Sequence, residues 1–307
     1  MKRRIAVLDL GTNTFHLMIS DVIENEVVQQ VVSVTKDVRL GEGGINRGII
    51  TKDAFNRGLT ALRSFHELIR KYTPDIIFAA GTAALRSASN SKDFIQQVKA
   101  ETGIEISLID GTREAELIFE GVKQAVDLPG PALIMDIGGG SVEFIFCDKN
   151  EVFHKKSYPI GAARLMEQFH HSDPIAEEDV LEIHRYLDEQ LADLKINAHI
   201  FKPQLLIGSA GAFETFADLA IQKFSLPSRI NKKCFSFNTE HLEAVIADIL
   251  KSTHEERTSN TAIIPIRVDM IVVSSILSAY ILEELQITNV ALSTYALKEG
   301  LLFQEIS

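Results

Sequence analysis

Hydrophobic residues follow two different spacings along the 307-residue chain, and together these spacings predict an α/β fold. Short apolar runs predict strands at residues 5–8, 15–19, 27–34, 76–80, 104–109, 132–135, 142–146, 205–207 and 290–293. Apolar positions at helical spacing, together with capping residues, predict helices at residues 55–69, 92–102, 112–126, 161–169, 177–194, 212–222, 239–252, 268–285 and 296–303. Strands and helices alternate along most of the chain, as is typical of α/β proteins.

One polar motif occurs twice, each time at the end of a predicted strand. Residues 9–14 read Asp-Leu-Gly-Thr-Asn-Thr, and residues 136–141 read Asp-Ile-Gly-Gly-Gly-Ser. Each copy joins two apolar runs, so each predicts the turn of a β-hairpin. Glycine lets backbone N–H groups approach phosphate oxygens, a hydroxyl adds a donor, and Asp9 or Asp136 could hold a divalent cation directly or through water. The predicted phosphate-binding residues are Gly11, Thr12, Asn13 and Thr14 in the first loop and Gly138, Gly139, Gly140 and Ser141 in the second.

The repeated motif also predicts the domain organisation. A single Asp-x-Gly is ordinary turn chemistry, whereas the same residues at the same offsets in two halves of a chain indicate a duplicated domain. Two prolines and a glycine at residues 128–131 end a predicted helix just before the second copy. We therefore predict one domain over residues 1–126 and another over residues 127–307.

Composition and charge argue against several classes of protein. A formal net charge of -11 argues against a nonspecific nucleic-acid binder such as a DNA-binding protein, which is usually basic. The two cysteines, Cys147 and Cys234, are too few for a disulfide framework or a zinc site, and they favour the cytoplasm. No apolar run reaches the ~18 residues of a membrane span, so no membrane association is expected.

Three charged residues near the two motifs are candidates for chemistry. Arg86 lies among small residues after a predicted strand, where its guanidinium could bind phosphate or simply lie at the surface. Glu114 lies in the first turn of a predicted helix. It could act as a general base, or it could simply be an acidic residue that complements the helix dipole. Glu143 shares a strand face with Ser141, so it could join Asp136 near a metal or be a solvated side chain.

The motifs resemble those of the exopolyphosphatase and guanosine pentaphosphate phosphohydrolase family, within the sugar kinase, actin and chaperone-ATPase superfamily. Six blocks carry the resemblance, in the order 9–17, 82–90, 111–121, 136–144, 161–165 and 293–301. The resemblance implies two ribonuclease-H-like domains of the actin-like ATPase kind that face an interdomain cleft, with one phosphate loop each. It also implies a final helix, at about residues 296–307, that packs back on the first domain, and a homodimer by family analogy.

The resemblance implies a role for each matching residue. Glu114 is expected to be the general base, and Asp136 and Glu143 are expected to lie around a magnesium ion and the attacking water. Arg86 and the two loops are expected to hold terminal phosphates. Ser209, Gly211 and Arg267 are expected to add a further phosphate or nucleotide contact, although residues 208–212 lack two hydroxyls that are usual in the family.

The hypothesis that joins these observations is magnesium-dependent hydrolysis of a terminal phosphoanhydride, with Mg²⁺ as cofactor and inorganic polyphosphate or guanosine pentaphosphate as substrate. Two other functions stay open. A small-molecule kinase of the same superfamily would share both loops, and a non-catalytic sensor would bind the same ligands without releasing phosphate.

Overall fold

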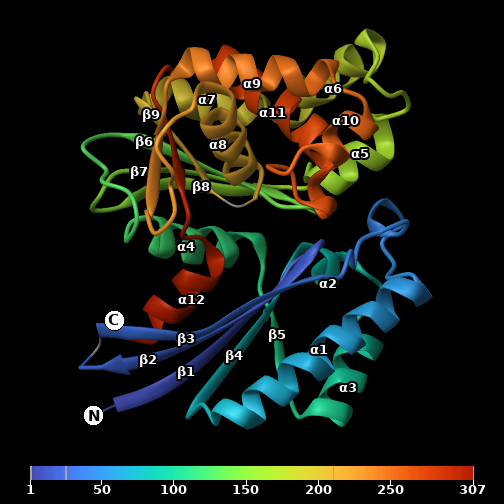
Figure 1. Cartoon of the computed structure of the whole chain (residues 1–307), viewed down its shortest axis with the longest axis vertical. Coiled ribbons are helices and arrows are strands. Elements are labelled where there is room, and N and C mark those ends of the chain that lie inside the picture. The colour runs from blue at the N-terminus through green and yellow to red at the C-terminus, as the bar shows by residue number, and fades with distance from the viewer. Residues whose placement is uncertain (1, 25, 210, 307) are drawn as a thin grey trace. The chain divides into compact units, whose positions relative to one another are not determined.

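The computed structural model describes residues 2–24, 26–209 and 211–306 and contains two compact units. Unit 1 consists of Met1–Gly121, Gly138–Gly140 and Leu297–Ser307, and unit 2 consists of Val122–Ile137 and Ser141–Ala296. Figure 1 follows the order of the elements along the chain. Each unit is described by itself.

Unit 1 contains a five-stranded mixed sheet. Its strands are β1 (Lys2–Leu10), β2 (Thr14–Ile23), β3 (Glu26–Asp37), β4 (Ile76–Gly81) and β5 (Ile106–Leu108), in the spatial order β3-β2-β1-β4-β5. Strands β1, β2 and β3 are antiparallel neighbours, whereas β4 and β5 run parallel to β1. The first motif forms the turn between β1 and β2, where Leu10 pairs with Phe15, as predicted.

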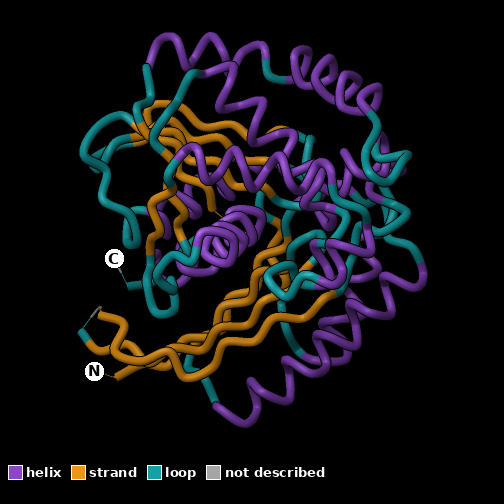
Figure 2. The backbone as a smooth tube through the Cα atoms, turned by 45° about the horizontal axis from the view of Figure 1, so that its top comes forward, coloured by secondary structure: helices purple, strands orange, loops and turns teal. Residues whose placement is uncertain are grey.

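Helices cover both faces of this sheet. They are α1 (Lys52–Tyr72), α2 (Ala83–Ser87), α3 (Ser91–Thr102), α4 (Gly111–Val122) and α12 (Leu297–Gln304). Successive residues of β1 point to opposite faces and are buried on both, as Ala6 and Val7 show with no exposed surface. Figure 1 shows α1 and α3 on one face, while α12 packs on β1. In Figure 2, α1 is the long helix that runs beside the strands of this sheet.

Unit 2 contains a six-stranded mixed sheet and most of the helical residues. Its strands are β6 (Ala132–Ile137), β7 (Val142–Cys147), β8 (Val152–Tyr158), β9 (Leu205–Ser209), β10 (Cys234–Phe237) and β11 (Val290–Ser293), in the order β10-β11-β9-β6-β7-β8. Its helices are α5 (Ala162–Phe169), α6 (Glu177–Gln190), α7 (Ala192–Phe201), α8 (Gly211–Phe224), α9 (Thr239–Lys251), α10 (His254–Ser259) and α11 (Met270–Leu285). Helix α11 is buried along most of its length, because it packs against α5, α6, α7, α8 and α9.

The two sheets repeat one topology. In each, three antiparallel strands (β1-β2-β3 and β6-β7-β8) are followed by two strands parallel to the first (β4-β5 and β9-β11). The second motif forms the turn between β6 and β7, so it occupies the same position in its sheet as the first motif. The predicted α/β class is therefore confirmed.

The element boundaries differ from the prediction in places. The helix predicted over 177–194 is two helices, α6 and α7, because Leu191 leaves helical geometry with φ -109° and ψ 15°. The helix predicted over 112–126 ends at Val122, and the one predicted over 268–285 begins at Met270 after a short 3-10 helix. Strand β10 and helices α2 and α10 were not predicted, since short elements carry little periodic signal. Strand β8 was missed because its sequence, VFHKKSY, is polar over residues 154–157 and gives no apolar run. No helix in the described ranges is long and apolar enough to cross a membrane.

Candidate functional site

The first phosphate-loop candidate is held by the segment that follows β3. The backbone N–H groups of Val38 and Arg39 donate to the carbonyl of Asn13 at 2.9 and 2.7 Å, and Gly41 N–H donates to the carbonyl of Thr12 at 3.1 Å. The N–H and C=O of a trans peptide point in opposite directions. The amides of Asn13 and Thr14 therefore face away from this segment, as a loop that binds an anion requires.

The second glycine loop lies against the first within unit 1. Gly139 contacts the Asn13 side chain, and a Cβ on Gly140 would lie 2.7 Å from both Ala83 Cβ and Thr12 Oγ1. A side chain does not fit at either position without displacing these neighbours. Gly139 and Gly140, which the sequence predicted as part of a separate loop, thus pack against side chains of the first loop.

Arg86 and Glu114 form an ion pair in unit 1. Arg86 lies on α2 and Glu114 in the first turn of α4, and Arg86 Nη1 donates to Glu114 Oε2 at 2.8 Å and to the Ile109 carbonyl at 3.0 Å. The Glu114 side chain is only 9% exposed, whereas that of Arg86 is 27% exposed. The negative charge of the buried Glu114 carboxylate is therefore balanced by the partly exposed guanidinium of Arg86.

Two buried carboxylates face each other in unit 2. Asp136 on β6 pairs with Glu143 on β7 in the antiparallel register, and both residues are less than 10% exposed. Side chains directly opposite in such a pair have Cβ atoms roughly 5 Å apart, and like charges there repel. Asp136 accepts a hydrogen bond from Ser209, and Glu143 Oε1 accepts from Ser141 at 2.7 Å and from Ser157 at 2.6 Å.

This donor set fits magnesium. A divalent cation beside Asp136 and Glu143 would offset their repulsion, and both supply the hard oxygen ligands that Mg²⁺ prefers. In the described parts of the chain, no group of three or more His, Cys, Asp or Glu side chains is arranged to hold a metal ion. One or two carboxylates completed by water and substrate phosphates is the coordination usual for Mg²⁺.

Asp9, the other predicted metal ligand, has different surroundings. It occupies in β1 the position that Asp136 has in β6, but the residue opposite it in β2 is His16. The two copies of the motif therefore differ in chemistry, with two opposed carboxylates in unit 2 and a carboxylate opposite an imidazole in unit 1.

The residues predicted as a third contact have protein partners in unit 2. The Ser209 hydroxyl donates to Asp136, and the Arg267 guanidinium covers Gly211 and donates to Glu214 at 2.9 Å and to Thr215 at 3.2 Å. Ala210, in the middle of the predicted block, lies outside the described residues. In this structure Ser209 thus orients a candidate metal ligand.

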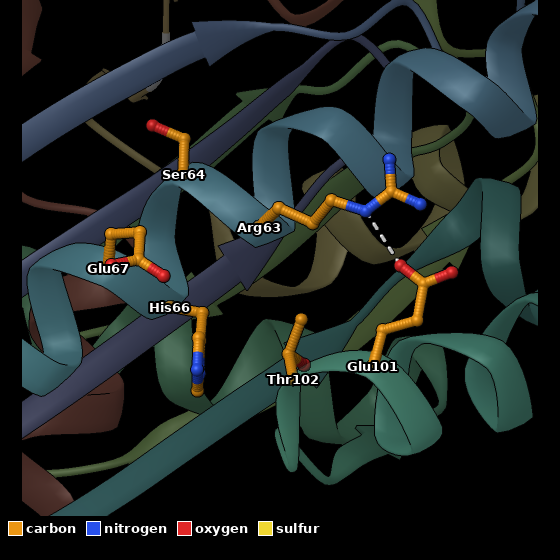
Figure 3. A pocket seen from close by; sticks show the side chains of 6 residues that line it. All are labelled: Arg63, Ser64, His66, Glu67, Glu101 and Thr102. Atoms are coloured by element: carbon orange, nitrogen blue, oxygen red, sulfur yellow. Dashed lines mark hydrogen bonds and ion pairs between the residues drawn. The ribbon is translucent and has the colours of Figure 1, made fainter.

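Two surface hollows lie among helices of single units. One, of about 640 Å³, is lined by residues of α1 and α3, and Figure 3 shows Arg63 reaching from α1 to Glu101, with a distance of 2.7 Å between Arg63 Nε and Glu101 Oε2. The other, of about 350 Å³, is lined by residues that include Leu219, Val245 and Arg257. None of the predicted site residues lines either hollow.

Sequence reasoning missed His16, Thr35 and Ser157. His16 contacts Thr14 of the first motif, Thr35 contacts His16, and Ser157 donates to Glu143. One signal was available, because His16 and Glu143 stand at the same offset from Asp9 and Asp136. Thr35 and Ser157 could not be found in this way, since their contacts depend on the register of β3 and β8.

The repeated sheet topology, with a glycine-containing hairpin turn at the same place in each copy, defines the actin-like ATPase fold with two ribonuclease-H-like units. Comparison with known proteins then assigns the family. The sequence matches the Ppx/GppA phosphatase family over residues 18–307, and the chain belongs to this family.

Relatives of similar length support the assignment. The chain is 38% identical to a crystallised exopolyphosphatase from Cytophaga hutchinsonii, with a TM-score of 0.96 and coverage of 99% of this chain and 98% of that one. It is 28% identical to exopolyphosphatase 1 of Mycobacterium leprae, over 99% of this chain and 89% of the relative. The fold is also that of the Aquifex aeolicus PPX-GPPA enzyme, with 23% identity, a TM-score of 0.81 and coverage of 99% and 100%.

Proposed function

We propose that the protein hydrolyses terminal phosphoanhydride bonds and releases orthophosphate, with inorganic polyphosphate, guanosine pentaphosphate or both as substrate. The observation that carries this proposal is the arrangement within unit 1, where two glycine loops adjoin and a buried glutamate is paired with an arginine. Loop amides and an arginine suit a phosphate chain, and a carboxylate suits the activation of water.

Each residue has a role in the proposed reaction. The amides of Asn13 and Thr14 and the surface around Gly139 bind phosphate oxygens. Glu114 accepts a proton from the attacking water, and Arg86 neutralises phosphate charge once substrate competes for its guanidinium. Inorganic polyphosphate is supported by the relatives named exopolyphosphatase.

Magnesium is part of the same proposal. Asp136 and Glu143 would hold the ion, and Ser209 would orient Asp136. When bound, Mg²⁺ would supply positive charge that stabilises the transferring phosphoryl group. Ser141 and Ser157 keep the Glu143 carboxylate in one orientation, so the ligand does not need to be ordered when the ion binds.

One assay tests the proposal. Orthophosphate release is measured on long-chain polyphosphate, tripolyphosphate, guanosine pentaphosphate and ATP, each with Mg²⁺ and with excess EDTA. We expect release from at least one of the first three substrates, and loss of that release in EDTA. Tight binding without release on any substrate would instead favour a sensor, and phosphorylation of an added sugar by ATP would favour a kinase.

A reducing compartment such as the cytoplasm agrees with the state of the cysteines. Burial raises the pKa of the Cys147 thiol to about 12 and also raises the pKa of Cys234. Both are free thiols, and raised pKa values keep them protonated and unreactive. A homodimer, expected from family analogy, remains part of the proposal and is tested by sedimentation.

A further inference from the structure

Three side chains of unit 1 form a hydrogen-bonded row that ends in the first phosphate loop. His16 Nε2 lies 2.9 Å from Thr14 Oγ1, and His16 Nδ1 lies 2.9 Å from Thr35 Oγ1. Thr14 and His16 share a face of β2 because they are two residues apart, and Thr35 is directly opposite His16 on β3. The strand register therefore determines the row.

Unit 2 has the same row at the corresponding positions. Ser141 and Glu143 are two residues apart on β7, and Ser157 is directly opposite Glu143 on β8. Both serine hydroxyls donate to Glu143 Oε1, at 2.7 and 2.6 Å. Each motif thus ends in a hydroxyl that bonds to a central side chain, which also bonds to a hydroxyl of the third strand.

The two central side chains, His16 and Glu143, differ in whether they can donate a hydrogen bond. The Ser141 hydroxyl donates to Glu143 Oε1, so the Ser141 proton points to Glu143 and Ser141 presents lone pairs elsewhere. A neutral imidazole donates at one nitrogen and accepts at the other, and a protonated one donates at both. Whenever Nε2 carries a proton, Thr14 must accept from His16, and the Thr14 proton is then available to another acceptor.

We infer that His16 is a positioning residue that directs the hydroxyl proton of Thr14 toward a phosphate oxygen of the substrate, whereas Ser141, whose proton points to Glu143, can offer a ligand only lone pairs. Thr35 supports this arrangement by donating to Nδ1 while Nε2–H donates to Thr14. The first loop then binds phosphate with a directed hydroxyl, and the second loop offers an oxygen that suits a cation or its bound water. This inference rests on the proposed function, since it names how that substrate is held.

Two substitutions of His16 that differ in side-chain length test whether the hydrogen bond to Thr14 matters for activity. The amide nitrogen of glutamine in His16→Gln is at about the position of Nε2 and can donate to Thr14, whereas the shorter side chain of His16→Asn is nearer to Nδ1 and Thr35. We expect kcat/KM for polyphosphate to fall about three- to tenfold in His16→Asn, which corresponds to one hydrogen bond, and to stay within about twofold in His16→Gln. Ser33→Ala, on the exposed part of β3, is the control and should leave kcat/KM unchanged.

A double-mutant cycle separates positioning from a general structural effect. If His16 acts through Thr14, His16→Asn has no further effect on kcat/KM in a Thr14→Val background. An equal loss in both backgrounds, or equal losses in the Gln and Asn variants, would overturn the inference. Melting temperatures measured in parallel show whether a loss of activity arises from unfolding.

The protonation of His16 provides a test that needs no turnover. Nitrogen-15 spectra of histidine-labelled Glu114→Gln protein with bound tripolyphosphate should show a proton on Nε2 of His16, with the signal assigned by its loss in His16→Gln. An unprotonated Nε2 in this complex would overturn the inference, because the Thr14 proton would then point to the imidazole. If wild-type protein released no orthophosphate while Nε2 was protonated in the complex, the proposed hydrolysis would fail and the inferred positioning would stand.

Discussion

Arg86 Nη1 and Glu114 Oε2 lie 2.8 Å apart, so the candidate phosphate ligand and the candidate general base of unit 1 are one ion pair. The pair has a consequence for both roles. Substrate phosphates and the Glu114 carboxylate compete for the same guanidinium. Binding of a phosphate chain would therefore weaken the hold of Arg86 on Glu114 at the moment when the carboxylate is needed as a base.

Glu114→Gln should lower orthophosphate release by about 10²- to 10⁴-fold, which is the usual contribution of a general base. The glutamine carbonyl can still accept from Arg86, so melting temperature and polyphosphate affinity should change little. Glu116→Gln, on the same helix and paired with Arg113, is the matched control and should keep near wild-type turnover. Full activity in Glu114→Gln would contradict the assignment of the base.

Arg86→Ala should reduce both activity and stability. Removal of the guanidinium leaves Glu114 buried without this partner, which costs about 3–5 kcal/mol for a fully buried pair. Because Arg86 is 27% exposed, water screens the charge and we expect about 1–2 kcal/mol by chemical denaturation. Adding Glu114→Gln should recover part of this stability without restoring turnover; the absence of any recovery would show that the two residues are not coupled.

Gly140→Ala tests the packing of the two loops. Its Cβ would lie 2.7 Å from Ala83 Cβ and Thr12 Oγ1, and overpacking of this kind costs about 1–3 kcal/mol. We also expect a higher KM for polyphosphate, since Thr12 must shift. Gly130→Ala is the control, because the nearest atom to its Cβ is Gln204 Oε1 at 4.0 Å. Similar KM values for the two variants would argue against contact between the loops.

Ser209→Ala should change the magnesium requirement. Ser209 donates to Asp136, and loss of a group that orients a metal ligand typically lowers metal affinity about 10- to 100-fold. The Mg²⁺ concentration at half-maximal activity should rise by at least about tenfold, while KM for polyphosphate at saturating Mg²⁺ stays unchanged. A raised KM with an unchanged Mg²⁺ requirement would indicate that Ser209 binds substrate instead. Ser236→Ala, on β10 of the same sheet, is the control.

The stability of the protein should fall in acid through Asp21. Hydrogen bonds from Arg4 and Lys2 lower the pKa of this buried carboxyl to about 2, below its usual value of 3.8. A carboxyl with a depressed pKa stabilises the folded state above pH ~4, and its contribution disappears as pH falls toward ~2. Asp21→Asn should therefore lose about 1–2 kcal/mol near neutral pH and show a flatter dependence of stability on pH between 4 and 2. A parallel dependence in both proteins would contradict this.

The features that were predicted correctly from sequence are those that depend on residues close together along the chain. Both motif turns and the long helix α1 depend on local spacing, and the structure confirms them. The Arg86 to Glu114 pair was not predicted as a pair, since the two residues are 28 positions apart in the sequence and only the tertiary fold brings them together. The contact of Gly139 with Asn13 was missed for a similar reason, because a glycine that makes room for another residue leaves no periodic pattern.

The position of α12 has a consequence for synthesis of the chain. Gly300 on α12 packs against the carbonyl of Leu117 and α12 lies on β1, so the first unit is completed by residues from the end of the sequence. At a translation rate of ~5–20 residues per second, Leu297 emerges roughly 10 to 35 s after Gly121. During that interval β1 lacks the helix that packs on it in the folded protein, so the unit that is synthesised first is completed only after Leu297 and the residues that follow it have been made.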